Sequence, residues 1–140
     1  MIVSTKGRYA LQVMIELTKA GPDEYIPLKE IAAKQDISQK YLENIMSALS
    51  KGGVVDAIHG KGGGYRLNKA ASEYRISDIL RTTENSLAPV SCIEDSSSTC
   101  DKAGVCMTFP IWHELNDLIN DYLDSISLQD VIDKNHSVGL

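Results

Sequence analysis

The chain has 140 residues, of which 43% are hydrophobic and 24% are charged, a composition typical of an ordinary folded protein with no room for a second large domain. It has no run of about 18 apolar residues and no signal-like apolar stretch near its start, so we expect a cytoplasmic protein with no membrane partner. The formal net charge of −5 by itself argues against a nucleic-acid partner.

The charge is divided unevenly along the chain. Residues 1–75 contain 11 Lys and Arg against 8 Asp and Glu, a net charge of +3. Residues 76–140 contain 3 Lys and Arg against 11 Asp and Glu, a net charge of −8. We therefore expect only the first half of the chain to meet DNA.

The first fifty residues are patterned as three helices. Apolar residues recur at helical spacing over about residues 5–20, and a short second helix is expected from Pro27 to near residue 35. A turn at 36–38 leads to a third helix over about residues 38–51, which Ser38 can cap. Its apolar stripe consists of Leu42, Ile45, Met46 and Leu49. Two short helices joined by a tight turn predict a helix-turn-helix.

The opposite face of the third helix is polar. It carries Lys40, Glu43, Asn44 and Ser47, which can donate hydrogen bonds to base edges or accept them. Such a polar face is more often simply exposed to solvent and binds nothing. A basic hairpin beside the helix makes DNA contact the better interpretation, and Lys6 and Arg8 at the start of the first helix can add phosphate contacts.

That hairpin follows the third helix. Residues 54–58 and 65–67 are patterned as strands around a glycine-rich tip, and the basic residues are His59, Lys61 and Arg66. A glycine-rich phosphate loop needs a helix after it, whereas strands flank this loop on both sides. The segment is therefore predicted to be the wing of a winged helix.

The second half has three parts. A short helix is expected over residues 76–83, and residues 84–107 show no periodicity. A long apolar helix follows, and such a helix needs a partner, which predicts a dimer. Its apolar residues are Ile111, Leu115, Leu118, Ile119, Tyr122, Leu123 and Ile126. The predicted divisions are 1–83 (winged helix-turn-helix domain), 84–107 (cysteine loop), 108–134 (dimerisation helix and short closing helix) and 135–140 (loose tail).

Three cysteines lie in the aperiodic segment. Cys92, Cys100 and Cys106 are separated by seven and five residues. Structural zinc sites usually have closer cysteine pairs and four ligands. An iron-sulfur cluster is the favoured interpretation of three thiols on a loop, with redox-active thiols, zinc and unrelated cysteines as alternatives.

Several segments together resemble the iron-sulfur regulators of the IscR type. They are Lys6-Gly7-Arg8-Tyr9-Ala10, Ile37-Ser38 with Tyr41-Leu42-Glu43, Gly62-Gly63-Gly64-Tyr65-Arg66-Leu67, and the three cysteines before Trp112. The resemblance covers about residues 1–133. Related regulators are NsrR, RirA and CymR, which respond to nitric oxide, iron and cysteine supply, and CymR lacks the cluster cysteines.

This resemblance implies a mainly α-helical fold with a β-hairpin wing, and a homodimer held by crossed long helices. It implies that Ser38, Gln39, Lys40, Tyr41, Glu43 and Asn44 lie at the major groove and that His59 and Lys61 approach the minor groove. The partner would be double-stranded DNA with a pseudo-palindromic promoter site. The cofactor would be a cluster of two or four irons on Cys92, Cys100 and Cys106.

The chain departs from this family at the fourth cluster ligand. Phe109 stands three residues after the last cysteine, where IscR has a histidine, and the first gap between cysteines is two residues longer. Some relatives recruit a carboxylate at the position of Arg8, whose guanidinium cannot coordinate a metal as a cation. The remaining candidates are Glu94, Asp95, Asp101, His113 or an exogenous ligand.

The predicted function is a transcription regulator whose DNA affinity or site choice is controlled by the cluster. One alternative keeps DNA binding and uses the cysteines as a thiol switch. Another is a small iron-sulfur electron carrier, which is disfavoured because such carriers usually supply four protein ligands. No set of base, nucleophile and oxyanion donor suggests an enzyme.

Overall fold

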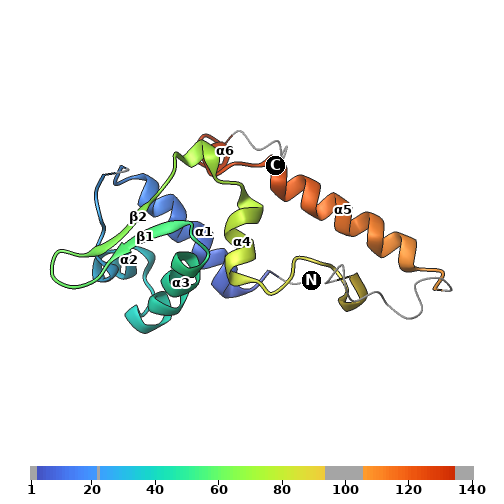
Figure 1. Cartoon of the computed structure of the whole chain (residues 1–140), viewed down its shortest axis with the longest axis horizontal. Coiled ribbons are helices and arrows are strands. Elements are labelled where there is room, and N and C mark those ends of the chain that lie inside the picture. The colour runs from blue at the N-terminus through green and yellow to red at the C-terminus, as the bar shows by residue number, and fades with distance from the viewer. Residues whose placement is uncertain (1–2, 22, 94–105, 135–140) are drawn as a thin grey trace.

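The structure is a computed structural model that describes residues 3–21, 23–93 and 106–134 (Figure 1). The helices are α1 (Thr5–Thr18), α2 (Leu28–Gln35), α3 (Gln39–Lys51), α4 (Ile76–Thr83), α5 (Phe109–Ser125) and α6 (Leu128–Ile132), with 3-10 turns η1 (Ala71–Glu73) and η2 (Ser91–Ile93). The strands are β1 (Val55–Ile58) and β2 (Gly64–Leu67). The predicted fold class, mainly helical with a two-stranded wing, is confirmed.

A left-handed residue and a side-chain cap form the turn of the helix-turn-helix. The α2 helix ends at Asp36, whose φ of 53° turns the chain, and Ile37 N donates to Ala32 O at 3.2 Å. Ser38 then starts α3, because its Oγ accepts a hydrogen bond from Tyr41 N at 3.1 Å. The expected Ser38 cap is therefore present. The α1 helix ends at Thr18, two residues earlier than its apolar pattern predicts.

The wing is a short antiparallel hairpin with an added contact. Its register pairs Val55 with Leu67 and Ile58 with Gly64. Ile26, far earlier in the chain, exchanges two backbone hydrogen bonds of 2.9 Å with Tyr65 and so extends the sheet by one bridge. A Cβ on Gly64 would lie 2.3 Å from the carbonyl oxygen of Ile26, so this close approach requires glycine.

The main core lies between α1, α2, α3 and the hairpin, and α6 completes it. Tyr74 is fully buried, and its hydroxyl donates to Val54 O at 2.8 Å and accepts from Asn68 N at 2.9 Å. Burial raises the pKa of this phenol. Leu128 of α6 is also fully buried, which is worth about 1.5 to 3 kcal/mol for a leucine. The last helix thus returns to the winged domain after α5.

Helix α4 lies between the helix-turn-helix and α5 (Figure 1). The hydroxyl of the buried Ser77 donates to Asp124 of α5. Arg81 reaches the same helix, because its Nη1 lies 3.3 Å from Asp124 Oδ1 and its Nη2 donates to Asn120 Oδ1 at 3.1 Å. The hydrogen bond from Ser77, followed by the charge of Arg81, lowers the pKa of Asp124.

We expect Asp124 to make stability depend on pH in acid solution. A lowered folded pKa means that its contribution is fully present above the ordinary value of 3.8 and is lost as pH falls through the lower folded value. The side chain is 51% exposed, so the contribution should stay under about 1 kcal/mol. Urea unfolding from pH 7 down to about pH 3 should show that Asp124→Asn flattens this dependence. Asp121→Asn, an exposed change on the same helix, should not flatten it.

Candidate nucleic-acid interface and cysteine segment

The two faces of α3 separate as the sequence predicts. The apolar stripe Leu42, Ile45, Met46 and Leu49 is fully buried. Lys40, Glu43, Asn44 and Ser47 are all exposed, and Ser38 and Gln39 are exposed at the start of the helix. The structure therefore presents a continuous polar surface along α3, available to base edges.

An aromatic contact fixes the start of α3 against α1. Tyr41 is partly buried and meets the ring of Tyr9 edge-on, with centroids 5.9 Å apart and planes at 81°. Arg8, the residue before Tyr9, is exposed and its Nη2 lies 3.4 Å from Thr5 Oγ1. The packing of Tyr41 holds the predicted DNA-contacting end of α3 beside the cationic start of α1.

Lys6, a second cation of α1 predicted to contact DNA, lies near the middle of α3. Lys6 of α1 lines a hollow of about 510 Å³ together with Asn44 and Ser47 of α3. Lys51, at the end of α3, also lines it. Three residues predicted to contact DNA from two different helices are thus brought together, and Lys51 is a residue that the sequence analysis did not select.

The wing residues divide into two groups. His59 and Lys61 are exposed at the tip of the hairpin, where a wing can approach a groove. Arg66 lies on β2 instead, with its guanidinium 4.5 Å from the ring centre of Tyr25 and its Nε 3.6 Å from Asp56 Oδ2. The guanidinium of Arg66 is therefore already engaged inside the hairpin.

Two of the three cysteines fall on described backbone near α5. Cys92 belongs to η2, which packs against α5. Cys106 comes just before α5, is partly buried, and has its Sγ 3.3 Å from Thr108 Oγ1. Cys100, Glu94, Asp95 and Asp101 lie outside the described residues. Within the described ranges no three His, Cys, Asp or Glu side chains gather as a metal site, so the cluster ligands stay a prediction.

The remaining described candidate for a fourth ligand is His113. It is exposed on α5, and its Nδ1 lies 3.6 Å from Asp117 Oδ2. Its ring centre is 6.1 Å from that of Phe109, one turn earlier. His113 is therefore held along the surface of α5 by its own helix neighbours.

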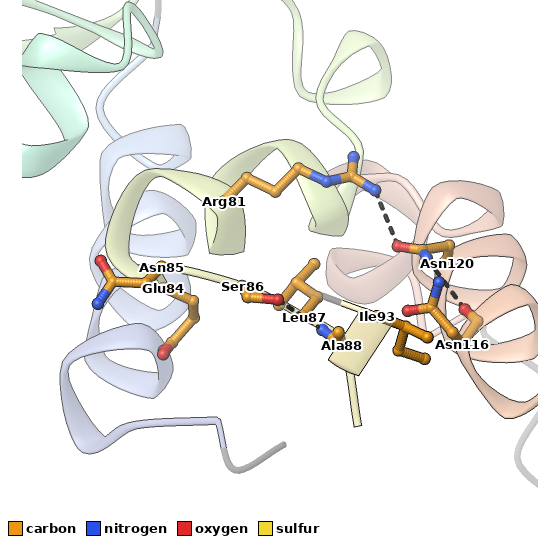
Figure 2. A pocket seen from close by; sticks show the side chains of 9 residues that line it. All are labelled: Arg81, Glu84, Asn85, Ser86, Leu87, Ala88, Ile93, Asn116 and Asn120. Atoms are coloured by element: carbon orange, nitrogen blue, oxygen red, sulfur yellow. Dashed lines mark hydrogen bonds between the residues drawn. The ribbon is translucent and has the colours of Figure 1, made fainter. Parts of the chain in front are cut away.

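The segment that leaves α4 crosses to α5 over a polar cavity of about 380 Å³ (Figure 2). Arg81 enters from α4 and points toward Asn120, which lies beside Asn116 on α5. Leu87 and Ile93 line the side formed by the crossing segment. Residues 84–93 therefore contact both the winged domain and the long helix.

Glu84, the first residue of this segment, is hydrogen-bonded to Ser4 at the start of α1. Its Oε1 accepts hydrogen bonds from Ser4 N at 3.0 Å and from Ser4 Oγ at 2.6 Å. Ser4 Oγ in turn accepts from Gly7 N at 3.0 Å and caps the helix that carries Lys6. A Cβ on Gly7 would lie 2.3 Å from Glu84 Oε1, so a side chain there would displace the Glu84 carboxylate. No local pattern in the sequence indicates this pair.

Helix α5 exposes much of its apolar side. Ile111, Leu115, Leu118 and Tyr122 are 57%, 37%, 60% and 50% exposed, and Ile119 is partly buried. Leu123 and Ile126, which the sequence analysis grouped with them, pack instead within the chain against Ile76, Leu80 and Leu87. The structure thus limits the unpartnered stripe to the part of α5 before residue 123.

The profile of the Rrf2 family, described as an iron-dependent transcriptional regulator, matches residues 3–134. The chain belongs to the Rrf2 family. As a member it is a DNA-binding transcription regulator, which confirms the coarse prediction of function.

Relatives of this Rrf2 protein match over nearly its whole length. IscR of Photorhabdus laumondii is 34% identical over 132 residues, covering 94% of this chain and 79% of the relative. The solved structure of T. potens IscR has a TM-score of 0.73 at 30% identity and covers 100% of this chain and 92% of that one. CymR, the global cysteine regulator of B. subtilis, has a TM-score of 0.73 at 35% identity, with 94% and 95% covered.

Among the described residues of this Rrf2 protein, no helix has the length and apolar character needed to span a bilayer.

We expect Glu84→Gln to loosen the start of α1. The amide keeps one carbonyl acceptor but loses the charge that strengthens both bonds from Ser4, so the cost should be roughly 1 kcal/mol. Hydrogen exchange should report faster exchange at the amides of Gly7 and Arg8, which bond to Ser4. Glu114→Gln, an exposed change on α5, should leave these amides unchanged. Equal protection in both variants would contradict the role given to Glu84.

Proposed function

We propose that the protein is a homodimeric transcription regulator whose DNA affinity or site choice is controlled by an iron-sulfur cluster on Cys92, Cys100 and Cys106. The observation that carries the proposal is the position of the cysteine segment, which is tied to α1 at Glu84 and reaches α5 at Cys106. Membership of a family described as iron-dependent supports the same conclusion.

The DNA interface is proposed to comprise α3, the start of α1 and the wing. The exposed polar face of α3 enters the major groove, where its N-terminal residues meet base edges. His59 and Lys61 contact the minor groove or its phosphates from the wing tip. The positive first half of the chain supports this arrangement despite the negative net charge.

The dimer is proposed to form through the exposed stripe on α5. Four large apolar side chains at positions 111, 115, 118 and 122 follow a spacing of four, three and four residues, which is one face of a helix. Two such stripes crossing on a two-fold axis would cover each other and set the spacing of two half-sites. A pseudo-palindromic site is the DNA that such a dimer would bind.

The donor chemistry fits a cluster only in part. Three thiolates are the soft ligands that iron-sulfur clusters use, and the partial burial of Cys106 offers shelter from solvent. Phe109 supplies no donor at the position where IscR has histidine. A bound cluster, of two or four irons, would supply a group that iron, oxygen or nitric oxide can alter. Glu94, Asp95, Asp101, His113 or an exogenous ligand would complete it.

Coupling to DNA is proposed to run through the two ends of the cysteine segment. At one end Glu84 holds the cap of α1 and therefore the position of Lys6. At the other end Cys106 lies beside Thr108, the residue that starts α5. A change in the conformation of the segment would shift both the phosphate contacts and the dimer spacing.

We expect Glu43→Ala to alter base preference. A carboxylate accepts from the amino group of cytosine and repels the acceptors of guanine, so its removal should relax selection at one position of each half-site. Selection from a random duplex library, with wild type in parallel, measures this. A uniform loss of affinity on every sequence would contradict base contact by Glu43.

Lys61 of the wing is expected to contact a phosphate and not a base, so we expect Lys61→Ala to leave base preference unchanged. A phosphate contact carries no sequence information, so affinity should fall evenly across sequences and the slope of log K against log salt should fall by about one unit per protomer, or about two for the dimer. Fluorescence anisotropy at several salt concentrations measures both quantities. An effect confined to certain sequences would show that Lys61 contacts bases.

The cluster is tested by anaerobic iron and sulfide reconstitution of wild type and Cys92→Ala. We expect a brown wild type with acid-labile sulfide, a bleached variant, and a difference in DNA affinity between cluster-loaded and cluster-free wild type at matched salt. Ser91→Ala, the neighbouring change that keeps every thiol, should stay brown. A colourless wild type that binds DNA would overturn the cluster in favour of a thiol switch.

A further inference from the structure

The hollow between α1, α3 and α4 has an unusual charge for this chain. Three cations line it, namely Lys6 from α1, Lys51 from α3 and Arg81 from α4. The rest of its lining is neutral and consists of Asn44, Ser47, Ala48, Gly52 and Thr82. A protein with a net charge of −5 therefore keeps a purely cationic depression beside the helix that faces DNA.

No carboxylate of the described residues neutralises the lysines of this hollow. Arg81 pairs with Asp124, and elsewhere Lys19 and Lys34 pair with Glu16. Across the described part of the chain, neither Lys6 nor Lys51 lies within ion-pair distance of an acidic side chain. Two ammonium groups are thus available to an anion from outside.

The lining of the hollow includes both closely packed and polar residues. Gly52 and Thr82 are closely packed, because a Cβ on Gly52 would lie 2.4 Å from Thr82 Cγ2. Asn44 and Ser47, exposed on α3, supply an amide and a hydroxyl that can donate. The C-terminal half of α3 has a negative dipole end, so an anion there must be held by side chains, and Lys51 supplies the charge.

We propose that this hollow binds a backbone phosphate of the DNA duplex, held chiefly by Lys6 and Lys51. The inference rests on the proposed DNA interface and adds Lys51 to it. Asn44 and Ser47 belong both to the hollow and to the polar face of α3, so a duplex lying on that face passes over the hollow. The phosphate would fix how deeply the second half of α3 enters the groove.

The test uses the full-length protein and a labelled duplex selected with wild type from a random library. Lys51→Gln should lower the salt slope of binding by about one unit per protomer, or about two for the dimer, and weaken all duplexes evenly. Lys51→Arg should restore the slope because it keeps the charge. Lys19→Gln removes the same charge at the far end of α1, roughly 20 Å from Lys6, and should leave the slope unchanged. Thermal unfolding of each variant verifies that it is folded.

The outcomes separate this site from the interface as a whole. If wild type binds the duplex with a clear salt dependence and Lys51→Gln has the same slope of log K against log salt, the phosphate site is overturned. The proposed function is then unaffected. If wild type binds no duplex, both the phosphate site and the proposed function are overturned. Inorganic phosphate, titrated at constant ionic strength, should not displace the duplex. If millimolar phosphate abolished the difference between wild type and Lys51→Gln, a small free phosphate and not the duplex would be the ligand.

Discussion

Close packing of α4 against α1 and α3 is the constraint on which the rest of the structure depends. A Cβ on Gly52, at the end of α3, would lie 2.4 Å from Thr82 Cγ2, and a Cβ on Gly7 of α1 would displace the carboxylate of Glu84, which follows α4. The same short helix holds α5 through Ser77 and Arg81. A movement of α5 or of residues 84–93 would therefore act on α1 and α3 or break polar contacts that are partly buried.

Local patterns were sufficient for most of the fold. The 3.6-residue periodicity of α3 predicts both its buried stripe and its exposed face, and Ser38 marks its start, because helix burial and capping depend on neighbours within one or two turns. The glycine-rich tip likewise predicts the hairpin. The family resemblance added the DNA partner, which the Rrf2 match confirms at the level of a regulator.

Contacts between distant segments could not be predicted in this way. Ile26 joins the wing at Tyr65, and Ser4 bonds to Glu84 eighty residues away, and neither pair leaves a periodic signal. Ile126 lies four residues after Tyr122 and so follows the same spacing as the exposed stripe of α5, and only the path of the chain assigns it to the cluster with Leu80. The same limit applies to the cluster site, because convergence of three thiols on a loop depends on its three-dimensional path.

The distribution of ion pairs explains how an acidic chain can still bind DNA. Acidic side chains pair with Lys19, Lys34 and Arg81, which removes those cations from the surface field. Among the described residues, Lys6, Lys40 and Lys51 have no such partner, so no described carboxylate cancels their field at the proposed interface. The acidic second half is screened over roughly 8 Å at physiological salt, and it repels a duplex only where the two come closer than that. Repulsion from the acidic half and attraction at α3 would therefore together favour one orientation of the duplex on the dimer.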